Sequence, residues 1–103
     1  MRLKTYYCTF TGADGWRGAC FVRAERKGLA ERVALFHGCH PGGECLTIEV
    51  PAGAPPIEPM WLNRVLDDGE VEEATGCEVV KISQRELFEL RFRAWVPRIG
   101  EVH

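Results

Sequence analysis

The sequence predicts an α+β fold in which one helix packs on an antiparallel sheet of about six strands. Two observations favour this class. Short segments with alternating or continuous apolar residues recur along the chain, separated by turns rich in Gly and Pro. One segment, residues 59–69, instead carries its apolar residues at helical spacing. With 103 residues, the chain has the length of a single domain, 1–103.

The first two predicted strands form a hairpin. Residues 3–10 and 16–24 are rich in side chains that suit a pleated surface, and the Gly-Ala-Asp-Gly segment 12–15 between them is a strong turn signal. Because the two segments are symmetric about this turn, Cys8 falls opposite Cys20. We therefore expect these two thiols to be neighbours on one face of the sheet.

Two more strands are predicted before the middle of the chain. Residues 33–36 form a continuous apolar run inside the segment 31–37, which is typical of a strand covered on both faces. A loop rich in Gly and Pro follows at 38–43, and residues 44–50 then alternate in side-chain character. The first half is thus expected to be a four-stranded antiparallel meander.

A helix follows the meander. The proline-rich segment 51–56 cannot donate to a sheet and takes the chain out of it. Pro59 suits the first position of a helix, and Gly69 suits the position just past its end. An apolar stripe lies between them, formed by Trp61, Leu62, Val65 and Leu66.

The last third of the chain supports two interpretations. Residues 79–82 are mostly apolar and residues 88–96 alternate with period two, so both segments are predicted to be strands. Ser83 and Glu86 have the spacing of a capping box, which instead favours a helix within 84–96. The alternation is the stronger pattern, because on a helical wheel the same apolar residues spread over most of the circumference.

The composition indicates where the protein works. The 13 basic and 15 acidic residues give a net charge of −2, which argues against binding nucleic acid through bulk charge. No apolar run reaches the ~18 residues of a membrane span, and none of signal-peptide length follows the N-terminus. The 5 cysteines are odd in number and irregularly spaced, which indicates thiols or metal ligands in the reducing cytoplasm. Arg far outnumbers Lys, a bias typical of a GC-rich bacterial genome.

The densest group of chemically active side chains lies at 37–45. His37, Cys39, His40 and Cys45 are nitrogen and sulfur ligands of the kind that zinc prefers. A hairpin loop at 38–43 would allow three of them to converge on one ion. The alternative is a tight loop with buried thiols and surface imidazoles, which needs no cofactor. A catalytic Cys–His pair would need a third, orienting group, and the sequence shows none.

An acidic run follows the predicted helix. It consists of Asp67, Asp68, Glu70, Glu72 and Glu73. Asp67 and Asp68 are expected in the last turn of the helix, where the helix dipole disfavours anions. Anions placed against the helix dipole, with no visible compensation in stability, mark a candidate functional surface. We therefore expect the run to be exposed and to bind a partner with a basic surface. The alternative is a solvated loop that keeps the protein in solution.

The sequence shows no catalytic constellation, so it favours a non-enzymatic role. We expect a small bacterial or phage-encoded module that binds another protein, as an inhibitor or an adaptor, with no required cofactor. Two alternatives stay open. One is a zinc or thiol site on the 37–45 loop, and the other is a small-ligand site formed by a homodimer.

Overall fold

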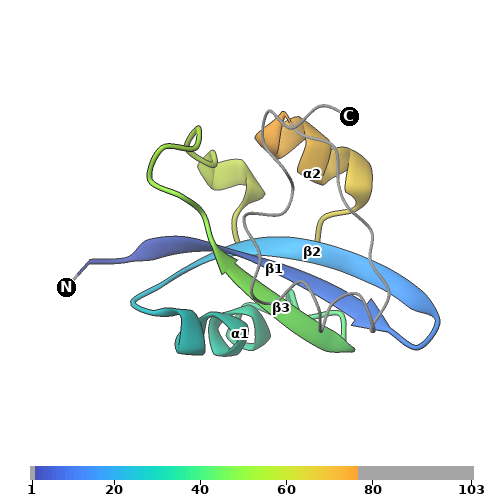
Figure 1. Ribbon diagram of the computed structural model, residues 1–103. Coiled ribbons are helices and arrows are strands. Elements are labelled where there is room, and N and C mark those ends of the chain that lie inside the picture. Colours follow the sequence, from blue (N-terminus) through green and yellow to red (C-terminus); the bar gives the residue numbers. More distant parts are fainter. Residues whose placement is uncertain (1, 77–103) are drawn as a thin grey trace.

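A computed structural model describes residues 2–76 of the chain (Figure 1). Its elements are β1 (Lys4–Gly12), β2 (Gly15–Ala24), α1 (Lys27–Phe36), β3 (Glu44–Glu49), the 3-10 helix η1 (Pro59–Trp61) and α2 (Asp68–Thr75). The predicted α+β class is confirmed. The prediction of six strands and one helix is wrong, because residues 2–76 form a 3-stranded antiparallel sheet and two α-helices. The predicted strands at 79–82 and 88–96 lie outside the described residues.

The predicted hairpin is confirmed. β1 and β2 pair antiparallel through the short turn between Gly12 and Gly15, and Cys8 is the register partner of Cys20. The register shifts once, between Phe10 and Thr11. Turn residues and strand composition were sufficient to predict this hairpin because a single short turn joins the two strands.

The predicted meander is wrong because its third strand is a helix. Residues 31–37 fall mostly in α1, whose two buried residues, Ala30 and Ala34, are four positions apart. This spacing places both on one side of a helix. The chain crosses the sheet through α1 and returns as β3, which pairs with β1 and not with β2. The strand order is therefore β2-β1-β3.

The predicted helix at 59–69 is also wrong in its bounds. The chain forms η1, leaves it at Leu62 in an extended conformation, and enters α2 only after Asp67. Between the two helices, the backbone of Leu66 exchanges hydrogen bonds of 3.1 and 2.7 Å with Ala19, and Asn63 N donates to Phe21 O at 2.9 Å. The backbone groups that pair with the outer edge of β2 would form hydrogen bonds within the helix if the helix were continuous.

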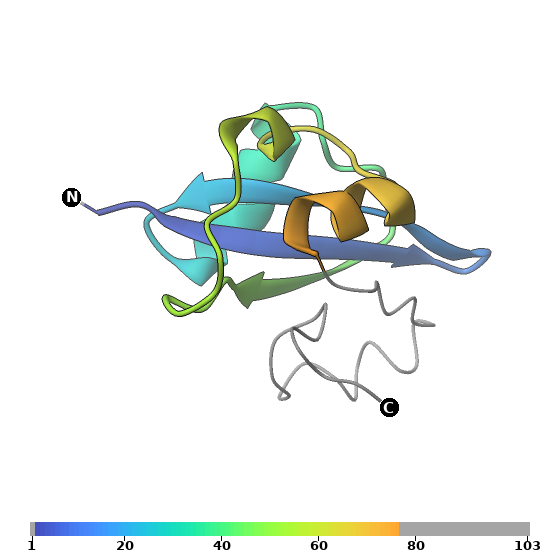
Figure 2. The same cartoon turned by 90° about the horizontal axis from the view of Figure 1, so that it is seen from above.

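The sheet is covered on both faces (Figure 1). α1 lies on one face, while η1 and α2 lie on the other, and α2 passes over the strands when the molecule is seen from above (Figure 2). The α1 face buries Tyr6, Cys8, Phe10, Cys20, Val22, Ala24, Ala30, Ala34 and Cys39. The opposite face buries Tyr7, Ala19, Phe21, Trp61, Leu66 and Val71. Each strand thus contributes alternate side chains to two separate cores.

The helices of residues 2–76 are too short and too polar to cross a bilayer.

Candidate functional site

The four predicted zinc ligands occupy different environments. Cys39 is buried in the core, where its thiol lies 3.5 Å from the carbonyl oxygen of Ala34. Cys45 lies on β3, 3.5 Å from the hydroxyl of Thr47. His37 is exposed at the C-terminal end of α1, and its ring packs edge-on against Phe36. The loop at 38–43 does not turn these side chains toward one point.

His40 is held by contacts of its own. Its Nδ1 accepts a hydrogen bond from Gly42 N at 3.1 Å, and its Nε2 lies 2.8 Å from a carboxylate oxygen of Glu31. Because Nδ1 is an acceptor, the proton is assigned to Nε2, which donates to Glu31. The ring also packs on Phe10 at 4.5 Å between centroids. Both ring nitrogens are therefore already in use.

Within the described part of the chain, no group of three or more His, Cys, Asp or Glu side chains is arranged to hold a metal ion. The predicted zinc set His37, Cys39, His40 and Cys45 is thus not brought together. Zinc binding stays an untested prediction, now without a geometric argument in its favour.

The acidic run lies at the start of a helix, and not at the end of one as the sequence predicted. Asp67 is the N-cap of α2: its side chain accepts from Glu70 N at 2.8 Å, and the Glu70 side chain accepts from Asp67 N at 3.1 Å. The prediction that Asp67 and Asp68 end a helix is wrong. They begin one, where the dipole favours anions, so the presumed electrostatic cost is a gain.

The remaining members of the run differ in their surroundings. Asp68 accepts a hydrogen bond from Gly69 N at 2.9 Å. The Glu70 carboxylate pairs with Arg64, whose guanidinium lies 5.6 Å from the centroid of the Trp61 ring. Glu72 and Glu73 are exposed on α2. The run therefore combines helix capping with two glutamates that face solvent.

Four cysteines gather on the α1 face of the sheet. This thiol cluster consists of Cys8, Cys20, Cys39 and Cys45, and all four are free. A hydrogen bond to Cys20 is the main factor that raises the pKa of Cys8 to about 12. The hydrogen bond to Cys8, together with burial, raises the pKa of Cys45 well above its ordinary value, and burial raises that of Cys39. In the folded protein Cys8, Cys39 and Cys45 are therefore thiols and not thiolates at neutral pH.

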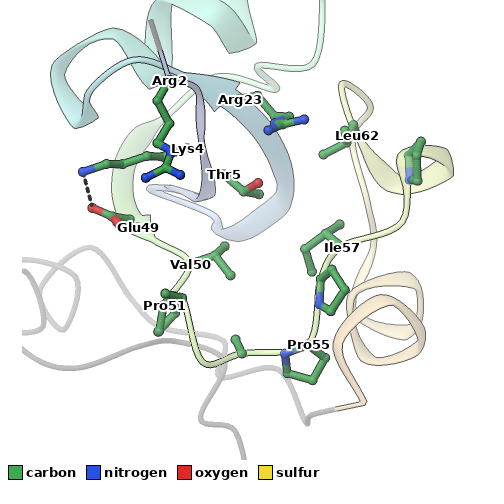
Figure 3. A pocket seen from close by; sticks show the side chains of 14 residues that line it. Arg2, Lys4, Thr5, Arg23, Glu49, Val50, Pro51, Pro55, Ile57 and Leu62 are labelled. Carbon is green, nitrogen blue, oxygen red and sulfur yellow. Dashed lines mark ion pairs between the residues drawn. The ribbon is translucent and has the colours of Figure 1, made fainter.

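A cleft of about 640 Å³ lies at one end of the sheet (Figure 3). It lies between the N-terminal end of β1, the C-terminal end of β3 and the proline-rich crossing. We call it the basic cleft, because its cations outnumber its acids. It is lined by Arg2, Lys4, Thr5, Arg23, Glu49, Val50, Pro51, Ala52, Ala54, Pro55, Pro56, Ile57, Pro59 and Leu62.

The shape of the basic cleft follows from the prolines. Val50 N donates to Thr5 O at 2.9 Å and makes the last backbone contact between β3 and β1. Pro51 has no N–H to continue the ladder, so the chain leaves the sheet at this point. It turns through a bond from Ala54 N to Pro51 O at 3.0 Å and returns toward η1. This detour leaves space beside the end of the sheet.

The cations of the basic cleft are only partly neutralised. Lys4 pairs with Glu49 at 3.7 Å, and both side chains remain about half exposed. Arg23 donates to the carbonyl oxygen of Leu3 at 3.5 Å. Among residues 2–76, no carboxylate lies within ion-pair distance of Arg2 or Arg23. The rim thus offers positive charge beside an apolar wall that includes Val50 and Ile57 (Figure 3).

Sequence reasoning did not identify the basic cleft. Its residues come from separate segments that meet only in the folded chain, and the proline-rich segment was interpreted only as a crossing. The run of prolines at the end of a strand was the one local signal, since such a run must leave the sheet. No family model, no curated protein and no solved structure matches this chain.

Proposed function

We propose that this protein is a small non-enzymatic module of the cytoplasm that binds another protein, and that the basic cleft receives the partner. The partner segment would offer a carboxylate beside an apolar side chain. The observation that supports this is the combination, around one opening, of three cations with a wall of proline and aliphatic side chains. A few placed charges over an apolar lining are typical of binding sites.

The exposure of the lining favours a protein segment over a small molecule. Pro51, Pro55, Pro56 and Pro59 line the cleft and remain exposed to solvent. A small-molecule pocket encloses most of its ligand, whereas an open trough can hold an extended chain that continues past both ends. Rigid prolines also lose little conformational entropy when a partner covers them.

The charges of the cleft determine how binding should depend on salt. A partner carboxylate would approach Arg2 and Arg23 and would compete with Glu49 for Lys4. Because these groups lie at an exposed rim, their main effect should be on the association rate, which falls as salt increases.

The acidic run supports a second, weaker candidate, the partner with a basic surface that the sequence suggested. Glu58 and Glu73 line a recess of about 280 Å³ together with Met60 and Trp61. Met60 is 57% exposed, so this recess joins an apolar side chain to two carboxylates. Asp67 and Asp68 themselves lie at the start of α2, so the unfavourable helix-end charges that first suggested this surface are absent.

Two model peptides distinguish these surfaces. One alternates Glu with Leu and the other alternates Lys with Leu, and each is titrated into labelled protein while backbone amide shifts are recorded by NMR. We expect the Glu-Leu peptide to shift the amides of Thr5, Val50 and Ile57. The variant with both Arg2→Gln and Arg23→Gln should weaken this binding roughly three- to tenfold, as expected for rim charges.

Arg32→Gln is the matched control, because Arg32 is an exposed cation on α1 outside the cleft. It should leave the affinity for the Glu-Leu peptide unchanged. If the double variant binds this peptide as the native chain does, the basic cleft is not the site. If only the Lys-Leu peptide binds, and the shifts map to Glu58 and Glu73, the recess beside Met60 is the binding site instead.

A further inference from the structure

The thiol cluster places its members on three neighbouring strands and at the end of α1. Cys20 lies on β2, Cys8 on the central strand β1, and Cys45 on β3, two residues from the register partner of Cys8. Cys39 follows α1 and belongs to the same buried cluster. Cys8 therefore has a neighbouring thiol on each side, and the question is which pair can be bonded.

Backbone register answers this question. Thr5 O accepts from Val50 N, so the polar backbone groups of odd-numbered β1 residues point toward β3, and those of Cys8 point toward β2. Cys8 and Cys20 are thus a hydrogen-bonded pair, with Cα atoms about 5.5 Å apart, inside the range that disulfides span. Cys8 and Cys45 are diagonal neighbours whose thiols hydrogen-bond, but their Cα atoms are about 7–8 Å apart, beyond the distance that a disulfide bridges without backbone movement.

The helix that covers these thiols, α1, is lightly anchored at its N-terminal end. It buries Ala30 and Ala34, and Leu29 and Val33 pack half-buried against the same core. Its N-cap, Arg26, makes no side-chain capping bond, and the helix has no acidic residue in its first turn and no basic residue in its last. A short helix whose N-terminal turn has no side-chain cap is the kind of element that opens locally, from that end, before the rest of a domain.

We propose that Cys8 and Cys20 are a site of reversible disulfide formation that becomes accessible when α1 opens. The oxidant is a low-molecular-weight disulfide. One thiolate of the pair attacks it, forms a mixed disulfide and expels one small thiolate. The second protein thiolate then attacks the protein sulfur of that mixed disulfide, forms the Cys8–Cys20 bond and expels the other. The pair loses two electrons and two protons, which the two small thiols carry away.

The geometry also makes this bond easy to reduce. Cβ atoms of a hydrogen-bonded strand pair lie near the upper end of about 4.5–5.5 Å, whereas a disulfide draws them to about 3.5–4.5 Å. The strand pair must strain to close the bond, and strained disulfides are the labile ones. Cys39 is the weaker partner for Cys20, because its thiol lies against the Ala34 carbonyl and moves with α1.

Oxidised glutathione, added to the native full chain at neutral pH, tests the proposal. After acid quenching and alkylation, trypsin separates the thiols: Cys8 lies in 5–17, Cys20 in 18–23, and both Cys39 and Cys45 in 33–64. We expect one disulfide joining 5–17 to 18–23, also in a Cys39→Ala variant, and rapid reversal by dithiothreitol. A different pairing, glutathione adducts alone, or reaction only after denaturation would overturn the assignment.

The role of α1 is tested separately with Arg26→Asp, which supplies the missing N-cap oxygen. A new cap should make opening of the helix on the order of fivefold rarer and slow disulfide formation by the same factor. Arg26→Gln is the matched control, because it removes the same positive charge and adds no good cap. Equal rates for Arg26→Asp and Arg26→Gln would contradict control by α1.

Discussion

The two α-helices within residues 2–76 are held in different ways. α1 buries Ala30 and Ala34 against the sheet and lacks side-chain capping at its N-terminus. α2 buries Val71, begins with a complete capping box at Asp67, and ends at Gly76 in the left-handed conformation. Gly76 has φ of 72°, which a residue with a Cβ rarely adopts. The two helices thus differ at their N-termini, where α1 relies on packing against the sheet alone and α2 has a capping box.

The comparison shows where each helix is vulnerable. Helix α1 should be sensitive to a change in side-chain volume at the sheet and insensitive to changes on its exposed side. Helix α2 should be sensitive to the loss of a single capping oxygen. The following predictions test this difference, from the largest expected effect to the smallest.

Ala34→Leu should destabilise the protein by about 3 kcal/mol, because a fully buried position between helix and sheet has no room for a larger side chain. The neighbouring change Leu35→Ala is the control, since Leu35 is 60% exposed and should stay within about 0.5 kcal/mol of the native chain. Urea denaturation measures both. Equal effects at the two positions would show that α1 is not packed by its alanine side.

Alkaline pH should weaken the α1 side of the core. Cys8 stays protonated in the folded protein up to a pKa of about 12, whereas an unfolded thiol ionises near its ordinary 9.0. Its stabilising contribution is therefore complete well below pH 9 and declines as pH rises toward 12. Between about pH 8 and 10.5 the free energy of unfolding should fall by about 2 kcal/mol from this thiol alone.

The measurement is the urea midpoint as a function of pH, with Cys8→Ala beside the native chain. The variant should show a shallower decline above pH 9. Tyr7, on the opposite face, also has a raised pKa because it is buried, so Tyr7→Phe gives the matched comparison for the other core. A native stability that is flat from pH 8 to 11 would contradict the prediction.

Asp67→Ala should cost about 1 kcal/mol, because the N–H of Glu70 loses the capping oxygen that it contacts at 2.8 Å. Asp67→Asn keeps a capping oxygen without the charge and should lose less. Thermal denaturation of the two variants separates the cap from the charge. If removing Asp67 stabilised the protein, the placement of this residue at the start of α2 would be wrong.

The sequence was sufficient for elements that are local and contiguous. The hairpin followed from one turn and two symmetric strands, and β3 followed from its alternation. α1 was missed because Val33–Phe36 reads equally well as a buried strand. In the structure Leu35 and Phe36 face solvent, at 60% and 84% exposure, while Ala34 packs inward, which is the pattern of a helix. A single sequence does not reveal which of these side chains are buried.

The second helix was missed for a different reason. Asp67 and Glu70 have capping-box spacing, so the signal for the start of α2 was present in the sequence. The prediction instead started the helix at Pro59, because proline favours the first helical position, but the helix η1 that begins there has only one turn. The backbone of Leu66 then pairs with Ala19, and that long-range contact ends any continuation. The basic cleft was beyond prediction because it depends on contacts between distant segments.

The segment between η1 and α2 has a consequence for how molecules of this protein meet each other. An unpaired strand edge is a template on which a strand of another molecule can add, and this is a common route to aggregation. The centre of the outer edge of β2 is already occupied, because Ala19 and Phe21 are bonded to Leu66 and Asn63. The irregular segment between η1 and α2 therefore blocks the addition of a strand from another molecule at the centre of this edge.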